Sequence, residues 1–242
     1  MWKGKSVSVV LTSYRERHSI REIIDDFFAT GVVDEVIVVD NNAEAGSKEE
    51  VQKTKAKLFF ETKQGQGYAL QTGMREAQGD YVILCEGDGT FSPHDVEKFL
   101  VYGEEFPVVL GTRTNTSLIG PDSAMFFLRR IADVLEGKLI EILFQSNRLT
   151  DIGCTYKLLR QETIKQLQPY WTKGDSHFIT EVTLQVVARH IPFVEIPVAF
   201  KQRVGISAVT ESLSNIVKWG VKLLLFILFF RLSWRYKFNI KK

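Results

Sequence analysis

The sequence predicts an α/β fold, with a Rossmann-like, mostly parallel sheet flanked by helices and a C-terminal apolar and basic tail. Short β-branched runs alternate with segments of helical periodicity through the first half of the chain. Polar or acidic residues follow three of these runs directly. Near residue 211 the composition shifts toward Leu, Phe and Trp with interspersed basic residues, so we expect one domain over 1–210 and a tail over 211–242.

Length, charge and cysteine content limit the function classes. A chain of 242 residues is most simply one domain with an appended tail, and a net charge of +2 does not indicate a nucleic-acid partner. Cys85 and Cys154 lack metal-type spacing, so we expect reduced structural thiols. The N-terminal residues enter a strand-like run without a signal-peptide pattern, which predicts chemistry on the cytoplasmic side.

The first half contains a predicted βαβ unit. The runs "VSVVL" (7–11) and "EVIVVD" (35–40) are typical of buried parallel strands because they are short and β-branched. Between them, apolar residues recur at helical spacing over 20–28, and the crossover is expected to be right-handed. The alternation continues with a weaker strand at 57–61, a helix near 68–78 and a strong strand at 81–85.

The second half contains fewer clear elements. In "SPHDVEKFL", Ser92 is the expected N-cap of a helix and Pro93 lies in its first turn. The run "VVLGTR" from Val108 predicts a strand. A long helical stretch at 122–144 and a final strand at 193–200 complete the prediction.

A pair of carboxylates leaves the strongest strand. In "YVILCEGDGTF" (81–91), Glu86 and Asp88 are separated by Gly87 and followed by another glycine. Ligand crevices of open α/β sheets lie beyond the carboxyl ends of the strands, so this pair and Asp40 are expected at one edge. Two hard oxygen ligands suit Mg²⁺ or Mn²⁺, whose other positions are filled by water and substrate phosphates. The glycines would let a metal-bridged diphosphate approach the backbone.

Several other chemistries are disfavoured. The segment "KQGQGYALQTGM" (63–74) lacks the third glycine of a dinucleotide fingerprint, and Asp40 precedes this segment instead of following it. The sequence has no phosphate-binding lysine loop of the NTPase type and no serine elbow with a paired histidine. Its four histidines are not paired at ligand spacing, so a catalytic imidazole is unsupported. The missing fingerprint, lysine loop and serine elbow disfavour a nicotinamide enzyme, an NTPase and a serine hydrolase.

Seven segments occur in the order "VSVVLTSYRER", "EVIVVDNNA", "KQGQGYALQTGM", "GDYVILCEGDGTFSP", "VVLGTR", "DIGCTYKLLR" and "EIPVAFKQRVGIS". In this order and spacing they resemble glycosyltransferase family two, the inverting enzymes of GT-A fold. The resemblance is closest to polyprenyl-phosphate sugar transferases of the dolichol-phosphate mannose synthase type, and it covers roughly residues 5–210. It implies a hexose-type sugar donor carried on UDP or GDP.

The resemblance also implies roles for individual residues. Tyr14, Glu16 and Asp40 would hold the base and ribose, while Glu86 and Asp88 would carry the metal and the donor diphosphate. Arg113 and one of Arg129 or Arg130 would steer the acceptor phosphate, and Lys157 and Arg203 would lie near one or other of the phosphate groups. The implied donor-binding set is Thr12, Tyr14, Glu16, Asp40, Gln64, Gly67, Glu86, Gly87, Asp88 and Arg203, and the implied catalytic set is Asp88, Arg113, Arg130 and Lys157.

Three positions depart from the family pattern. The first acid of the usual Asp-x-Asp triplet is Glu86, one methylene longer, which leaves two expectations open, weaker metal binding or a contact that runs through water at Glu86. Thr90 replaces a frequent glutamine, and Lys157 replaces an arginine, which supplies charge without a planar fork. These departures motivate an alternative hypothesis, a nucleotide-binding scaffold that has lost turnover.

The tail suggests a membrane substrate. Basic residues interrupt the apolar segment 216–234 and leave an uncharged run of eight residues, 223–230. That run is too short to span a bilayer, so we expect a helix in the interface of the membrane's cytoplasmic face, favoured by the basic end "RYKFNIKK". The alternatives are a helix docked on the domain and a homo-oligomer contact.

The acceptor determines the chemistry that the site needs. A lipid phosphate is already anionic near neutral pH, so positioning and charge neutralisation would dominate. A hydroxyl acceptor on a glycan would require a general base, for which Asp151 or Glu181 is the candidate. The tail favours the polyprenyl phosphate.

Overall fold

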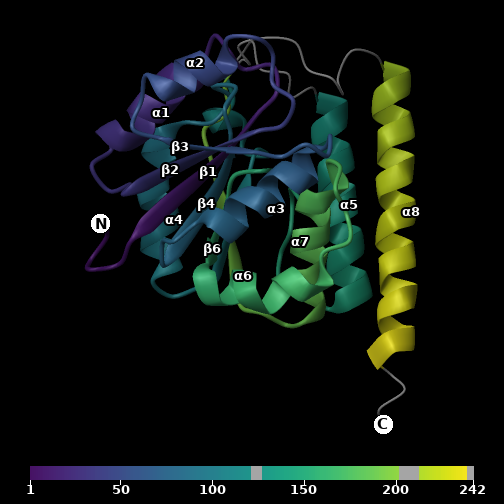
Figure 1. The fold of residues 1–242 in the computed structure, drawn as a ribbon. Helices are drawn as coiled ribbons and strands as arrows, with labels where there is room; N and C mark the ends of the chain where they lie inside the picture. The colour runs from purple at the N-terminus through teal and green to yellow at the C-terminus, as the bar shows by residue number, and fades with distance from the viewer. Residues whose placement is uncertain (121–126, 202–212, 239–242) are drawn as a thin grey trace.

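The computed structural model describes residues 1–120, 127–201 and 213–238. Helices cover both faces of a seven-stranded sheet, and a long C-terminal helix stands against one side (Figure 1). The strands are β1 (Val7–Ser13), β2 (Glu35–Asp40), β3 (Lys57–Phe60), β4 (Tyr81–Glu86), β5 (Val108–Thr112), β6 (Lys157–Arg160) and β7 (Phe193–Pro197).

The sheet confirms the predicted architecture and adds one reversed strand. Its order is β3-β2-β1-β4-β6-β5-β7. Strand β6 runs antiparallel to both of its neighbours, β4 and β5, whereas the other pairs are parallel. The N-terminal end of β6 therefore lies at the same edge as the carboxyl ends of β4 and β5, and it carries the segment that precedes β6 to that edge.

Side chains that alternate along the strands build a core on each face. Val9 and Leu11 of β1 pack on one face with α1 (Ile20–Ala29) and α4 (Val96–Gly103). Val10 points to the other face, which α3 (Gln66–Glu76), α5 (Phe127–Phe144), α6 (Gln161–Leu167) and α7 (His177–Ala188) cover. Because period-2 alternation separates the two sets, one strand serves both cores.

Element boundaries follow the predictions closely where the pattern is strong. The strand at 35–40 is confirmed, and the predicted helix near 68–78 is α3, two residues earlier. Ser92 makes no side-chain capping bond and precedes a 3₁₀ turn, η1 (Pro93–Asp95), before α4 begins. Four elements were not assigned from the sequence, α2 (Ser47–Gln52), α6, α7 and β6. Among the described residues, the 3₁₀ turns η2 (Thr116–Leu118) and η3 (Gln168–Tyr170) were not assigned either.

The two cysteines are free and buried, as expected for structural thiols. Burial raises the pKa of the Cys154 thiol to about 12, with a further contribution from the charge of Asp151. Burial also raises the pKa of Cys85 well above its usual range. Both sulfurs are therefore protonated and unreactive at neutral pH.

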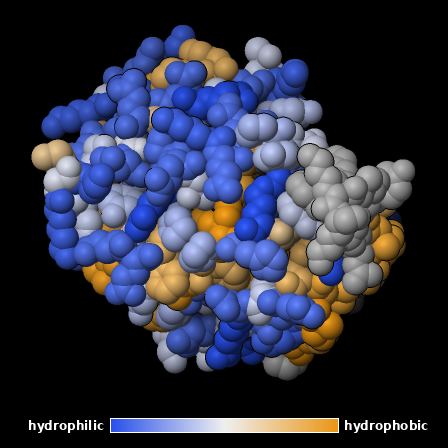
Figure 2. Space-filling model, turned by 90° about the horizontal axis from the view of Figure 1, so that it is seen from below, coloured by the Kyte–Doolittle hydropathy of each residue, from blue (hydrophilic) through white to orange (hydrophobic). Residues whose placement is uncertain are grey.

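The tail forms α8 (Leu213–Phe238), which docks on the domain along one face. Leu223, Ile227 and Phe230 are buried in the core shared with α5 and α7. The opposite face is apolar but exposed, and Phe229 is 71% exposed. Figure 2 shows apolar residues gathered on the side where α8 lies in Figure 1, beside a largely hydrophilic surface. Among residues 1–120, 127–201 and 213–238, no helix is long and apolar enough to cross a membrane.

Candidate active site

The sheet register brings the predicted acidic positions to one edge. In β1, Thr12 pairs with Glu86 of β4, and Ser13 pairs with Asp40 of β2. Ser13, Asp40 and Glu86 are the last residues of their strands, and Thr12 is the penultimate residue of β1, so all four lie at the carboxyl edge of the sheet, beside which the crevice of such folds is found. Asp40 and Glu86 therefore lie at one edge of the sheet, as the sequence predicted.

Glu86 and Asp88 are held by separate hydrogen bonds. Glu86 Oε1 accepts from Thr155 Oγ1 at 2.7 Å and from Gln66 Nε2 at 3.2 Å, which links β4 to the segment before β6 and to the start of α3. Asp88 is buried, and its Oδ1 accepts from the amide and hydroxyl of Thr90 at 3.0 and 2.6 Å. The two carboxylates are thus oriented by the protein itself.

The glycines of the acid turn have structural causes of their own. A Cβ at Gly87 would lie 2.5 Å from Ile20 Cδ1, so the first turn of α1 packs directly on the turn. Ser19 Oγ also donates to the Gly87 carbonyl at 2.7 Å. Gly89 has φ +76°, a left-handed conformation that favours glycine. Glycine is therefore needed at position 87 for packing against Ile20, in addition to the access for a diphosphate that the sequence predicts.

The loop after β1 is organised by Glu16. Its carboxylate accepts from the Tyr14 amide and, at 2.7 Å, from the Arg15 amide. Tyr14 itself is 38% exposed, with the Arg15 guanidinium over its ring. Asp40 Oδ1 accepts from Ala43 N at 2.8 Å and so closes the turn after β2. The bonds of Glu16 and Asp40 shape the loops, whereas the ring of Tyr14 stays partly exposed.

Asn41 is a positioning residue whose detailed role the sequence did not indicate. Its side-chain amide donates to the carbonyls of Glu61 and Lys63 at 2.9 and 2.8 Å, and its oxygen accepts from Gly65 N at 2.8 Å. Gln64 also donates to this oxygen, at 3.3 Å. The Asn41 side chain thus holds the segment that leads into α3. In the sequence, only its position directly after a strand indicated a functional role.

Gly67 serves helix packing. A Cβ at this position would meet Phe178 Cβ at 2.6 Å and the Asp175 carbonyl at 2.7 Å. The first turn of α3 therefore lies directly against the start of α7. The close approach explains the glycine independently of the donor contact that the resemblance implies.

Arg113 and Asp151 form a buried ion pair. Arg113 directly follows β5, and Asp151 lies in the segment that leads into β6. The guanidinium donates from Nε and Nη2 to the two carboxylate oxygens, each at 2.8 Å, and the Arg113 amide donates at 2.9 Å. Burial alone would raise the pKa of Asp151, but the charge and hydrogen bonds of Arg113 lower it. A carboxyl group with a lowered pKa is a weak general base, which argues against that role for Asp151.

Lys157 is fully buried at the start of β6. Within the part of the chain that the structure describes, its Nζ has no hydrogen-bond partner. Burial lowers the pKa of this lysine, although the charges of Asp151 and Glu195 oppose the shift. Glu195 is itself tied to the backbone amides of Thr150 and Asp151 at 2.9 Å. Desolvation therefore disfavours the charged form of Lys157, and the carboxylates of Asp151 and Glu195 favour it.

The remaining predicted residues either lie in helices outside the strand-end turns or fall outside the described residues. Glu181 lies in α7 and accepts from Thr172 and Lys173, so it fastens the loop before that helix. Arg130 is half-buried near the start of α5. The side chain of Arg129 and the whole of Arg203 lie outside the described residues.

The donor atoms suit a divalent metal bound mainly through its substrate. Among the described residues, no group of three or more His, Cys, Asp or Glu side chains is arranged to hold a metal ion. Glu86 and Asp88 supply hard carboxylate oxygens, and Mg²⁺ is commonly held by one or two carboxylates together with substrate phosphates. The residues present therefore fit Mg²⁺ or Mn²⁺ delivered with a diphosphate.

The fold and the strand-end carboxylates define an α/β protein of the GT-A class, and comparison with known proteins identifies the family. The family model described as Glycosyl transferase family 2 matches residues 8–166. The chain belongs to glycosyltransferase family 2. The predicted fold class and family are thereby confirmed.

The curated relatives are named as a glycosyltransferase and as an undecaprenyl-phosphate transferase. Glycosyltransferase AglJ of Haloferax volcanii is 24% identical over 200 residues, covering 82% of this chain and 64% of the relative. Undecaprenyl-phosphate 4-deoxy-4-formamido-L-arabinose transferase of Edwardsiella ictaluri is 25% identical over 172 residues, covering 66% and 51%. The chain thus spans less than two thirds of the length of these relatives.

Solved structures support the fold. Glucosyl-3-phosphoglycerate synthase of Mycobacterium tuberculosis, in complex with Mn²⁺, uridine diphosphate and phosphoglyceric acid, superposes with a TM-score of 0.70. The match covers 93% of this chain and 78% of that one, at 17% identity. Similarity at this level establishes a shared GT-A architecture.

Proposed function

We propose that this protein is an inverting glycosyltransferase that moves a sugar from a UDP- or GDP-linked donor to a polyprenyl phosphate. The observation that carries the proposal is the carboxylate pair Glu86 and Asp88, oriented at the carboxyl edge of a family 2 domain. Two curated relatives named as undecaprenyl-phosphate transferases support this acceptor class.

Glu86 and Asp88 would hold Mg²⁺ or Mn²⁺ with the donor diphosphate. The bound ion would neutralise charge that develops on the leaving diphosphate. The neighbouring structure with Mn²⁺ and uridine diphosphate supports a divalent ion in this fold. Tyr14, exposed after β1, and Asp40, at the end of β2, are the proposed contacts to the base and ribose.

The transfer itself needs little proton chemistry with this acceptor. A phosphate oxygen of the lipid would attack the anomeric carbon, the bond from that carbon to the diphosphate oxygen would break, and the nucleoside diphosphate would leave with the electron pair. Asp151 and Glu181, the candidate bases for a hydroxyl acceptor, are both engaged in structural hydrogen bonds. Their engagement favours an acceptor that arrives already anionic.

The outer face of α8 supports a location at a membrane surface, for which we propose the cytoplasmic face expected from the sequence. Leu225, Phe229 and Leu232 are 60%, 71% and 66% exposed. A docked helix with an apolar outer face suits the interface of a bilayer, from which a polyprenyl phosphate would be drawn.

An acceptor panel tests the function. The purified chain, supplied with Mn²⁺ and a set of nucleotide sugars, is offered farnesyl phosphate, farnesol or simple sugars, and the released nucleoside diphosphate is measured. We expect release with farnesyl phosphate and sugar transfer to its phosphate. Transfer to sugar hydroxyls alone would establish the glycan-acceptor alternative, and tight nucleotide binding without any transfer would establish the scaffold alternative.

A further inference from the structure

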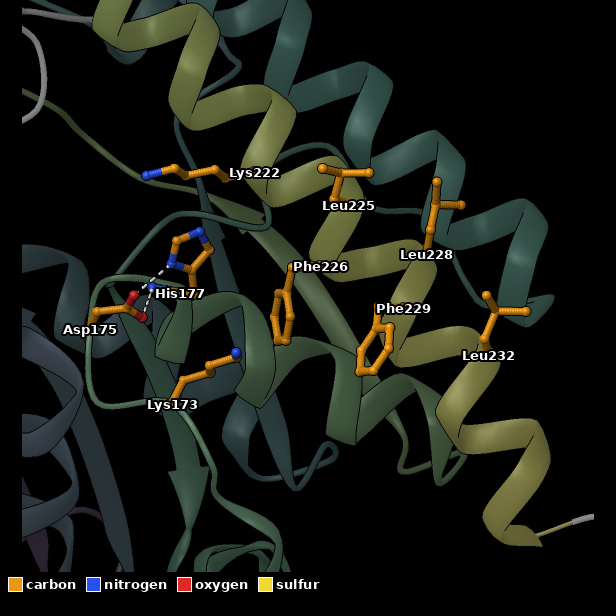
Figure 3. A pocket seen from close by; sticks show the side chains of 9 residues that line it. All are labelled: Lys173, Asp175, His177, Lys222, Leu225, Phe226, Leu228, Phe229 and Leu232. Carbon is orange, nitrogen blue, oxygen red and sulfur yellow. Dashed lines mark hydrogen bonds and ion pairs between the residues drawn. The ribbon is translucent and has the colours of Figure 1, made fainter.

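A groove lies between the segment that precedes α7 and the helix α8, with a volume of about 580 Å³. Its two ends differ in chemistry (Figure 3). Lys173, His177 and Lys222 line one end, whereas Leu225, Phe229 and Leu232 line the other. The groove is therefore amphiphilic along the axis of α8.

The polar end carries more positive than negative charge. Asp175 is the carboxylate there, and it accepts from the amide and Nδ1 of His177 at 3.1 and 3.0 Å. Lys173 and Lys222 bring two ammonium groups to the same end. Lys173 Nζ lies 4.8 Å from the centre of the Phe226 ring, which places one cation where the polar and apolar parts meet. A single anionic head group matches this charge.

The apolar end is suited to a hydrocarbon chain. Leu225, Phe229 and Leu232 are each more than half exposed, and they follow one another at intervals of three or four residues along α8. Side chains at this spacing form a continuous stripe on a helix. Exposed apolar area of this kind marks an interaction site.

Hydrogen bonds connect the groove to the carboxylate pair. Gly174 accepts from Tyr68 N at 3.0 Å, and Lys173 accepts from Gln71 Nε2 at 2.6 Å, so the groove wall is fastened to α3. Gln66, the first residue of α3, donates to Glu86. The first turn of α3 thus has the carboxylate pair on one side and the polar end of the groove on the other.

We infer that this groove captures the lipid acceptor, an isoprenoid chain with a phosphate head. The phosphate lies between Lys173 and Lys222, and the first isoprene units lie along Leu225 and Phe229. This inference rests on the proposed function. Turnover then requires the head to move past the start of α3 to reach Glu86 and Asp88, so the groove contributes to lipid affinity and not to the chemical step.

Binding of farnesyl phosphate to the full chain tests the capture site. Calorimetry compares farnesyl phosphate with farnesol, which lacks the charged head, and with inorganic phosphate, which lacks the chain. We expect only farnesyl phosphate to bind well. The variants Lys173→Gln/Lys222→Gln and Leu225→Asn/Phe229→Asn should each weaken its binding by about tenfold or more. Each should raise the KM for the lipid by a similar factor while kcat stays unchanged.

Matched controls lie outside the groove. Lys218→Gln removes an exposed lysine one turn earlier in α8, and Ile142→Asn removes an apolar side chain that is 76% exposed on α5. Both controls should keep the wild-type affinity for farnesyl phosphate. Far-ultraviolet circular dichroism and the thermal midpoint verify that every variant is folded.

The outcomes separate this inference from the proposed function. If the wild-type chain transfers sugar to farnesyl phosphate and the groove variants bind it as tightly, the capture site is wrong and the function stands. If the chain neither binds nor uses farnesyl phosphate, both are wrong. Loss of binding to phosphatidylcholine and phosphatidylglycerol vesicles alone, with farnesyl phosphate affinity kept, would reassign the groove to bilayer docking. A dimer that the apolar variants dissociate would reassign it to a second copy of the chain.

Discussion

Arg113 and Asp151 are joined by two parallel side-chain hydrogen bonds of 2.8 Å, and neither residue is more than 5% exposed. The pair ties the end of β5 to the chain that leads into β6. The pair therefore stabilises the same edge of the sheet that carries Glu86 and Asp88. The positive charge of Arg113, which the resemblance assigned to an acceptor phosphate, is already compensated by Asp151.

Removing one partner of this pair should be strongly destabilising. Arg113→Met leaves Asp151 as a buried charge, and we expect the free energy of unfolding to fall by about 3–5 kcal/mol. The double variant Arg113→Met/Asp151→Leu removes both charges and should recover most of that loss. Urea unfolding of the two variants measures the difference, and equal loss in both would show that the ion pair is not the cause.

Lys157 should lower the free energy of unfolding and should contribute to sugar transfer. Its lowered pKa means that the unfolded chain binds more protons than the folded chain between the folded pKa and the ordinary value of 10.5. The stability contribution of the lysine therefore rises as the pH rises through that window.

We expect Lys157→Met to unfold at higher urea than the wild type at pH 7, and this advantage should shrink at pH 9.5. Methionine has a similar volume, so no large cavity is expected to obscure the comparison. The same substitution should lower sugar transfer, because a buried lysine whose pKa is shifted by desolvation and by nearby carboxylates is typical of a functional site. A variant equal to the wild type in both assays at both pH values would contradict this view.

Asp88 should be essential for metal-dependent nucleotide binding. Mn²⁺ added with a nucleoside diphosphate should raise the thermal midpoint of the wild type but not of Asp88→Asn, because a ligand selective for the folded state stabilises it. Sugar transfer should fall by about 100-fold or more, equivalent to about 3 kcal/mol of transition-state stabilisation. Glu97→Gln, an exposed acid on α4, is the control and should behave as the wild type. Full activity of Asp88→Asn would remove this residue from the metal site.

Gly67→Ala should loosen the contact between α3 and α7. The added methyl group would meet Phe178 Cβ at 2.6 Å, and overpacking of this kind costs about 1–3 kcal/mol. Gly220→Ala in α8 is the matched control, since the nearest atom to its added Cβ is 3.9 Å away. The control should be neutral or stabilising by up to about 1 kcal/mol. Chemical unfolding curves for both variants check the prediction.

The sequence was sufficient for the elements with strong local patterns. The strand at 35–40 and the delivery of Glu86 and Asp88 to the sheet edge follow from β-branched runs and from the position of the acids. Strand β6 was missed because four residues carry little periodicity, and nothing local indicates that a strand runs antiparallel. The hydrogen bonds from Thr155 and Gln66 to Glu86 depend on that tertiary arrangement and could not be predicted from spacing.

The reversal of β6 couples the register of this strand to the carboxylate pair. Lys157 pairs with Leu84 and Leu110, and Thr155, two residues earlier, meets Glu86. A two-residue slip of β6 would keep its inward and outward faces but move both side chains by about 7 Å along their neighbours. Because Thr155 donates to Glu86, such a slip would also remove one of the two hydrogen bonds that orient this carboxylate, so the register of β6 and the geometry of the carboxylate pair change together.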